Sequence, residues 1–329
     1  MAPSLLRPQA HLSNQEILEL AQQAPSILRK NPRAFETSPL LALFTASENT
    51  ELWIIYENLL LACLRIEDDR SAVEILARLA LRFGDDNQRI MALKGLVREA
   101  QAKDNAELEE ILKGYETVLI DIGNSGTNIP IAKRRVALLK SLGRPSDAIS
   151  ALVRLLEYSP TDAEAWSELS DLYLAQGMYA QAIYALEEVL VLSPNSWNMQ
   201  ARLGELLFMA AAASADAATY TFYAESVKRF CRSIELCDDY LRGYYGLKQA
   251  TDKLLSDPKL LKPSKQSGDD GLVLPPKQTL EALNEQATKK LAEIVRRYGA
   301  GDPLWQGYDV AEVAAARELL SKGEEKVVR

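Results

Sequence analysis

The chain has 329 residues and a formal net charge of −8, which arises from 46 acidic and 38 basic side chains. This acidic balance argues against electrostatic attraction to nucleic acid or to an anionic membrane surface. Only 16 glycines are present while 47% of the residues are hydrophobic, so long segments without turn residues favour an all-helical fold. With three cysteines and one histidine, we expect neither a metal site nor a cofactor, and the cysteine usage suits a reducing compartment.

The start of the chain contains no apolar core of a signal peptide, and residues 1–12 are expected to form a disordered tail. The longest apolar run, residues 52–64, is too short to span a bilayer and includes Glu57. We therefore expect no direct membrane span, and any association with a membrane would depend on other proteins.

The first half of the chain predicts helices in pairs. Ser13, with Glu16 three residues later, is a capping pattern for a helix that runs to about Lys30 and that Pro25 ends or kinks. Further helices are expected at residues 39–46, 49–66, 71–83, 87–102 and 105–122.

The clearest pattern lies at residues 163–196. Apolar residues that include Trp166 recur at steps of three and four, Gly177 interrupts them, a second stripe follows, and Pro194 ends it. The small Ala182 on the second stripe allows close packing against the large side chains of the first. This order of residue types over 34 positions is typical of a tetratricopeptide repeat.

The same period extends in both directions. Gly143 and Pro160 lie one period before their counterparts, so residues 129–162 form a second repeat. Its signature is weaker because Ala132 stands where Trp166 does. Residues 197–240 form a third repeat that an alanine-rich insertion near 210–221 interrupts. We expect the insertion to lengthen the first helix or to form a local loop.

These patterns define the predicted organisation. A helical array covers residues 13–256 and ends with a capping helix at 241–255. A linker or loop rich in Pro, Gly and Ser follows at 257–276, then C-terminal capping helices at 277–320 and a tail at 321–329. The predicted fold class is all-α, a superhelical solenoid of tetratricopeptide repeats.

One segment invites an interpretation as an enzyme. Residues 118–128 (VLIDIGNSGTN) could form a strand and a glycine-rich phosphate loop. The apolar residues before Gly123 keep helical spacing, however, and Pro130 is a helix start, so Gly123 is better interpreted as the end of a helix. No other catalytic constellation is visible, and the adjacent Glu187 and Glu188 diverge on a helix, so we expect no enzymatic activity.

Stacked helical pairs expose a groove lined by their first helices. The groove positions are those turned away from the buried stripe, and they are the predicted partner-binding residues. In chain order they are Lys133, Lys140, Asp171, Leu174, Glu205, Phe208 and Met209. Phe208 and Met209 are expected to be exposed and to suit docking of an apolar or amphipathic segment. The alternative is that the alanine-rich insertion folds over them. The basic run at Lys133 is expected to face solvent or a partner rather than nucleic acid.

Beyond the repeat signature, several segments resemble subunit 2 of the endoplasmic reticulum membrane protein complex. They are RIMALKGLVREA (89–100), the lysine-arginine run, DAEAWSELSDLY (162–173), YALEEVLVLSP (184–194) and RGYYGL (242–247). The resemblance covers roughly residues 50–300. The turn at residues 84–86, which lacks proline, and the alanine-rich insertion depart from the family pattern.

The resemblance implies a non-catalytic scaffold at the cytoplasmic face of the endoplasmic reticulum membrane, attached there peripherally. Its partners would be the membrane-embedded subunits and a second soluble subunit of a complex that inserts tail-anchored and multipass proteins.

The main alternative is a soluble co-chaperone or peptide-binding adaptor. Its carboxylate clamp would fall on Lys133, Ala137, Glu168, Asn198 and Arg202, of which only the first and last fit. A small helical enzyme is a more distant possibility.

Overall fold

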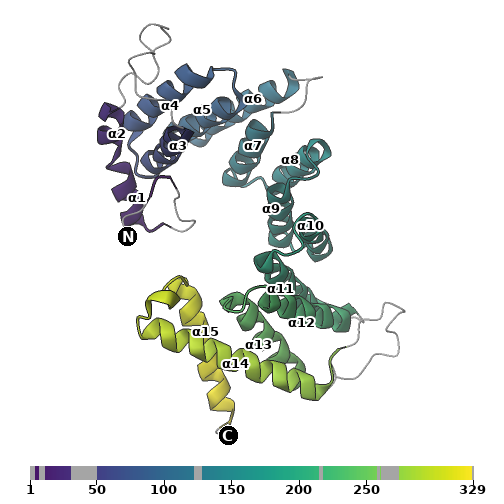
Figure 1. The fold of residues 1–329 in the computed structure, drawn as a ribbon. Helices are drawn as coiled ribbons and strands as arrows, with labels where there is room; N and C mark the ends of the chain where they lie inside the picture. The colour runs from purple at the N-terminus through teal and green to yellow at the C-terminus, as the bar shows by residue number, and fades with distance from the viewer. Residues whose placement is uncertain are drawn as a thin grey trace. The chain divides into compact units, whose positions relative to one another are not determined.

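The computed structural model describes residues 4–6, 12–30, 50–121, 128–214, 218–257, 260 and 274–327. These residues form helices and turns and no strand, which confirms the all-α prediction (Figure 1). The chain divides into two compact units, Met1–Pro160 and Thr161–Arg329, and the division falls inside the predicted array. Each unit is described separately below.

Unit 1 begins with two short helices, α1 (Asn14–Ala21) and α2 (Ala24–Lys30). Ser13 and Glu16 form the predicted capping box, in which each side chain accepts a hydrogen bond from the other residue's backbone. The break between the helices precedes Pro25, because a proline fits in the first turn of a helix, where its missing N–H has no helical partner.

Part of the predicted N-terminal tail packs on the helices. Leu5 is buried, and the Asn58 side-chain amide donates a hydrogen bond of 2.7 Å to its carbonyl oxygen. The prediction of a disordered tail is therefore wrong for residues 4–6. The short helix expected at 39–46 lies outside the described residues.

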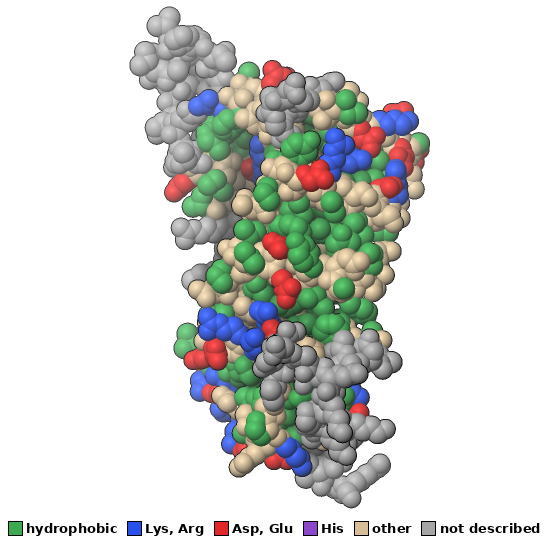
Figure 2. Space-filling view, turned by 90° about the vertical axis from the view of Figure 1, so that its right-hand side faces the viewer, with side chains coloured by type: hydrophobic (Ala, Val, Ile, Leu, Met, Phe, Trp, Pro, Cys, Tyr) green, Lys and Arg blue, Asp and Glu red, His purple; other side chains and the backbone are tan. Residues whose placement is uncertain are grey.

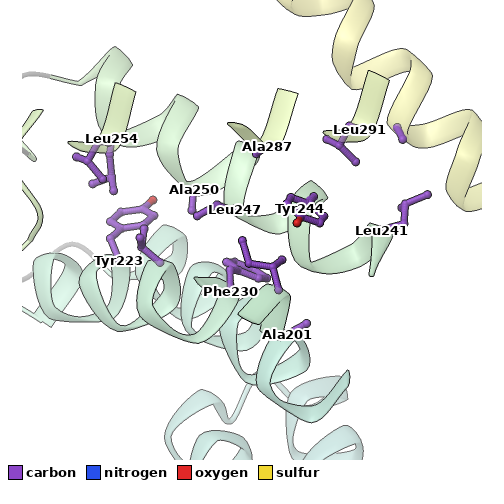
Figure 3. Packing of buried hydrophobic residues seen from close by; sticks show 14 of the residues in the cluster. Ala201, Tyr223, Phe230, Leu241, Tyr244, Leu247, Ala250, Leu254, Ala287 and Leu291 are labelled. Atoms are coloured by element: carbon purple, nitrogen blue, oxygen red, sulfur yellow. The ribbon is translucent and has the colours of Figure 1, made fainter. Parts of the chain in front are cut away.

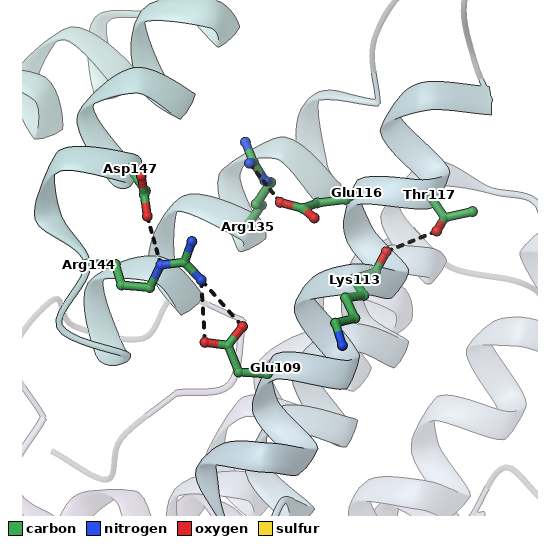
Figure 4. A network of polar contacts seen from close by, with 7 residues as sticks. All are labelled: Glu109, Lys113, Glu116, Thr117, Arg135, Arg144 and Asp147. Atoms are coloured by element: carbon green, nitrogen blue, oxygen red, sulfur yellow. Dashed lines mark hydrogen bonds and ion pairs between the residues drawn. The ribbon is translucent and has the colours of Figure 1, made fainter.

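The rest of unit 1 consists of antiparallel helices. They are α3 (Thr50–Arg65), α4 (Asp69–Phe83), α5 (Gln88–Gln101), α6 (Asn105–Asp121), α7 (Ile129–Ser141) and α8 (Pro145–Tyr158). Helix α3 packs on α4, α7 packs on α8, and α7 also contacts α5 and α6. Arg144 links the last helices, since its guanidinium donates to Glu109 of α6 at 3.3 Å and to Asp147 of α8 at 2.7 Å (Figure 4).

The segment with a possible phosphate loop is helical on both sides. Helix α6 continues to Asp121, and the Asn128 side chain caps α7, where Pro130 lies in the first turn. Residues 122–127, which include Gly123, lie outside the described residues. The apolar run therefore belongs to a helix, as its spacing predicted.

Unit 2 contains three successive helical hairpins. Helix α9 (Ala163–Ala175) pairs with α10 (Tyr179–Leu192), α11 (Trp197–Ala213) with α12 (Ala218–Leu236), and α13 (Leu241–Ser256) with α14 (Lys277–Gly299). The turn before α10 depends on Gly177, which has φ 71°, a left-handed conformation that favours glycine. One period earlier, Gly143 has φ 70°.

The alanine-rich insertion lengthens both helices of its repeat. Helix α11 has 17 residues and α12 has 19, against 13 and 14 for α9 and α10. Residues 215–217, between the two long helices, lie outside the described residues.

The C-terminal part departs from the prediction in two ways. Helix α13 does not end the stack of helical pairs, since it packs against α14 as a further hairpin. Helix α15 (Val310–Val327), which follows the short helix η2 (Pro303–Trp305), extends into the predicted tail. Lys322 and Glu318, one helical turn apart and 2.6 Å from each other, support this extension. Most of the predicted linker lies outside the described residues, but Leu274 is buried, and its N–H donates to the Tyr220 hydroxyl.

The largest described cluster of buried residues joins α11–α15. Figure 3 shows Phe230 pointing from α12 toward α13, where Tyr244 and Leu247 lie. A buried polar contact also connects α13 to α14, because the Asn284 amide donates to the Thr251 hydroxyl at 2.8 Å. Apolar burial supplies most of the stability of such a stack, and the polar contact fixes the register of the two helices.

Candidate partner-binding surface

The first helices of the hairpins in unit 2 carry a connected series of charges. Arg202 of α11 is 2.9 Å from Asp171 of α9 and 3.1 Å from Glu205 on its own helix. Burial acts to lower the pKa of Arg202, but its hydrogen bonds to the two carboxylates outweigh this effect, and the pKa is raised. Two of the predicted groove residues, Asp171 and Glu205, are thus joined through a common cation.

The series continues onto the next hairpin. Arg242 of α13 forms an ion pair of 2.6 Å with Glu312 of α15. The pKa of Arg242 is raised, first by this hydrogen bond and further by the negative charge of Glu205. Ion pairs thus connect α9 with α11 through Asp171, Arg202 and Glu205, and α13 with α15 through Arg242 and Glu312. We call these five residues the charge ladder.

The charge ladder weakens the case for a carboxylate clamp. Of Lys133 and Arg202, the two residues that fitted this pattern, Arg202 already has two carboxylate partners. Glu168 is an acid at a position where the clamp needs a donor. A peptide carboxylate would have to displace Asp171 or Glu205 from Arg202. This competition costs binding free energy.

The apolar groove candidates differ in their exposure. Phe208 is half-buried, and its ring meets that of Tyr223 edge to face, with 5.6 Å between the centroids. Met209 is 40% exposed, whereas Leu174 is half-buried against the core. Phe208 is less exposed than predicted because Tyr223 of α12 packs against it. Met209 is the more accessible of this pair.

The two lysine candidates lie in unit 1, on α7. Lys140 is exposed and Lys133 is half-buried. The neighbouring arginines of the basic run are engaged within the unit: Arg134 pairs with Glu99, and Arg135 lies 2.9 Å from Glu116 (Figure 4). Arginines that pair with carboxylates of their own unit are less available for phosphates.

Two of the cysteines, Cys63 and Cys231, show no sign of activation. Burial raises the pKa of Cys63 and of Cys231 to about 11, so both thiols are protonated at neutral pH. Within the described ranges, no group of three or more His, Cys, Asp or Glu side chains could hold a metal ion.

Sequence reasoning missed one exposed apolar surface, on the second helix of the clearest repeat. Tyr184 and Val191 of α10 are 57% and 74% exposed. They interrupt the expected pattern of an apolar inner face and a polar outer face. The available signal was the composition of α10, whose only charged residues are Glu187 and Glu188.

Comparisons with known proteins agree with this architecture. A family model described as tetratricopeptide repeat matches residues 137–198, which include the whole of the clearest predicted repeat. The TPR repeat protein oca3 of Schizosaccharomyces pombe is 31% identical over 224 residues, which cover 66% of this chain and 75% of oca3.

Similar proteins also include two named for a membrane complex. ER membrane protein complex subunit 2-A of Xenopus laevis is 30% identical over 209 residues, 64% of this chain and 65% of the relative. The subunit 2 of Saccharomyces cerevisiae is 28% identical over 172 residues, 50% of this chain and 56% of the relative. The chain belongs to the family of oca3 and ER membrane protein complex subunit 2.

This membership confirms the family resemblance and the tetratricopeptide-repeat fold class inferred from the sequence. The match to the subunit 2 relatives leaves a third or more of each relative's length uncovered. Among the described residues of this subunit 2 family member, no helix combines the length and hydrophobicity needed to cross a bilayer.

Proposed function

We propose that this protein is a non-catalytic scaffold subunit of an endoplasmic reticulum membrane protein complex. The observation that carries the proposal is the identity of 30% over 209 residues with a relative named as subunit 2 of that complex. The fold supports it, because tetratricopeptide hairpins present extended surfaces for protein segments rather than enclosed catalytic pockets.

The scaffold holds cytosolic parts of membrane-embedded subunits together, on the cytoplasmic face of the membrane, and also contacts a second soluble subunit. The complex inserts transmembrane segments of tail-anchored and multipass proteins. In unit 2, the charge ladder and the exposed Met209 offer polar and apolar contacts side by side on α11. In unit 1, Lys133 and Lys140 are the corresponding candidate contacts.

The decisive experiment uses the tagged full-length protein in cells. It should sediment with membranes, be released by alkaline carbonate, and be digested by protease added outside intact microsomes. Affinity purification from a mild detergent extract, followed by mass spectrometry, should recover membrane-embedded subunits of the complex. A purely soluble fraction with chaperones as the main partners would favour the co-chaperone alternative and overturn the proposal.

A further inference from the structure

The outward face of α10 carries two exposed apolar side chains, Tyr184 and Val191. Its inner face supplies core residues such as Leu186 and Val189, as the repeat requires. On the opposite face, Tyr184 and Val191 lie seven residues apart and therefore on one stripe, about 10 Å from each other along the helix. Large apolar side chains that stay exposed on one stripe of a helix are suited to contact with another molecule.

The structure holds this stripe in place. The Trp166 ring of α9 contacts the Tyr184 ring edge to face, with 6.1 Å between the centroids. The side chain of Tyr184 is thus supported from the neighbouring helix while it remains 57% exposed. An aromatic ring that is held in position loses little conformational entropy on binding, which favours its use as an anchor.

Carboxylates lie within the same stripe. Glu187 and Glu188 lie between Tyr184 and Val191 on adjacent helical positions, one on each side of the line that joins them. The charge of Glu188 and its hydrogen bond to the tyrosine raise the pKa of Tyr184. In Figure 2, hydrophobic and acidic side chains occur together at mid-height, over α10.

The sequence around the stripe carries charge of one sign only. Residues 155–201 contain no lysine and no arginine. They contain the acidic residues Glu157, Asp162, Glu164, Glu168, Asp171, Glu187 and Glu188. The segment that carries the stripe therefore offers Glu187 and Glu188 no cation, and a covering molecule that brings Lys or Arg would pair carboxylates that it would otherwise desolvate.

We propose that the outer face of α10, formed by Tyr184, Glu187, Glu188 and Val191, docks an amphipathic helix of a partner protein whose apolar stripe is flanked by Lys or Arg. This rests on the proposed scaffold function in taking the occupant to be a protein. A membrane surface fits less well, because anionic lipids repel the carboxylates and a hydrocarbon interface cannot pair them. A second copy of this chain would have to supply the cations from a different surface.

The test uses the full-length protein and two labelled synthetic peptides of about 14 residues, four helical turns. One peptide has leucines at helical spacing flanked by lysines, and the other replaces each lysine with glutamate. The lysine peptide should bind, with an affinity that falls as salt is added, and the glutamate peptide should not. Absence of binding by the lysine peptide, or equal binding of both, would overturn the proposal.

Variants locate the binding site. E187Q/E188Q and, separately, Val191→Ser should each weaken binding of the lysine peptide roughly tenfold, since one removes the charge and the other the apolar contact. The matched controls are E281Q/E285Q on α14 and Val310→Ser, since Val310 is 70% exposed and Val191 is 74% exposed. Thermal unfolding should be nearly unchanged in all four. Equal weakening by the controls would show non-specific attraction and overturn the proposal.

Two further measurements separate the other occupants. Flotation with vesicles of phosphatidylserine and phosphatidylcholine that depends on Val191 would assign the face to lipid. A dimer in sedimentation velocity that Val191→Ser dissolves would assign it to a second copy. If membrane-embedded subunits co-purify with the protein but the lysine peptide does not bind, only this inference fails and the proposed function stands.

Discussion

The ring of Phe230 on α12 occupies the space that a side chain on Gly246 of α13 would need. A Cβ on Gly204 of α11 would lie 3.0 Å from the same ring. Phe230 is 1% exposed, so two glycines from different hairpins allow one large aromatic residue to fill the core between them. The close approach of these three helices depends on residues that have no side chain.

Substitution of these glycines by alanine should therefore destabilise the protein, and more strongly where the new Cβ overlaps more with the Phe230 ring. Gly246→Ala should lower the free energy of unfolding by about 3 kcal/mol, through overpacking against Phe230, and Gly204→Ala by about 1 kcal/mol. Gly114→Ala is the control, because Gly114 is exposed within α6 and no atom would lie within 4 Å of its Cβ. Alanine at position 114 should raise the free energy of unfolding by about 0.5–1 kcal/mol, because alanine has a higher helix propensity than glycine. Denaturant unfolding measures all three, and equal effects at Gly246 and Gly114 would contradict the packing argument.

Truncation of aromatic residues should separate core from surface. Phe230→Ala should destabilise by about 3–5 kcal/mol, because it leaves a cavity. Trp166 is half-buried, and its ring meets that of Tyr184 edge to face. We expect Trp166→Ala to cost less, about 1–3 kcal/mol. A loss at Trp166 as large as that at Phe230 would mean that the indole is buried in solution.

Substitutions at Phe208 and Met209 should distinguish an effect on folding from an effect on partner binding. Phe208→Asp should destabilise the protein strongly, because the carboxylate would be placed against Tyr223 in a partly buried site. Met209→Asp should leave the melting temperature nearly unchanged while it reduces recovery of partners from a detergent extract. Full recovery of partners with Met209→Asp would move the binding surface away from this part of α11.

Stability at alkaline pH should depend on Tyr308. Burial, followed by the negative charge of Asp239, raises the pKa of Tyr308 from 10.0 to about 12, and its hydroxyl donates to the Asp239 carbonyl oxygen at 2.7 Å. The pKa of Tyr308 is higher in the folded protein than in the unfolded chain, so the protonated tyrosine stabilises the fold. This contribution to the free energy of unfolding is complete below pH 10.0 and is lost as the pH rises through about 12.

Tyr308→Phe tests this linkage. At neutral pH the variant should be less stable by about 1 kcal/mol, because it lacks the hydrogen bond. This difference should shrink as the pH approaches about 12, since only the wild-type residue loses stability by ionising. Urea unfolding at a series of pH values gives the comparison, and a difference that stays constant would refute the role of Tyr308.

Local sequence determined the helices and their ends. The capping box of Ser13, the left-handed turn at Gly177 and the proline in the first turn of α7 were readable because each depends on residues within one or two turns. The 34-residue period likewise placed the repeat at 163–196, because the same small and large residues must meet in every hairpin.

Tertiary structure decided which side chains remain exposed. The sequence could not show that Tyr223 would cover Phe208, because the insertion between α11 and α12 breaks the period that relates them. Nor could it pair α13 with α14 across residues 257–276, since no local signal spans a segment of that length. The contact of Arg202 with Asp171 joins residues 31 positions apart on successive first helices. The exposure of a side chain and the pairing of its charge depend on contacts between helices that are distant in sequence. Only the packing of the hairpins brings those helices together.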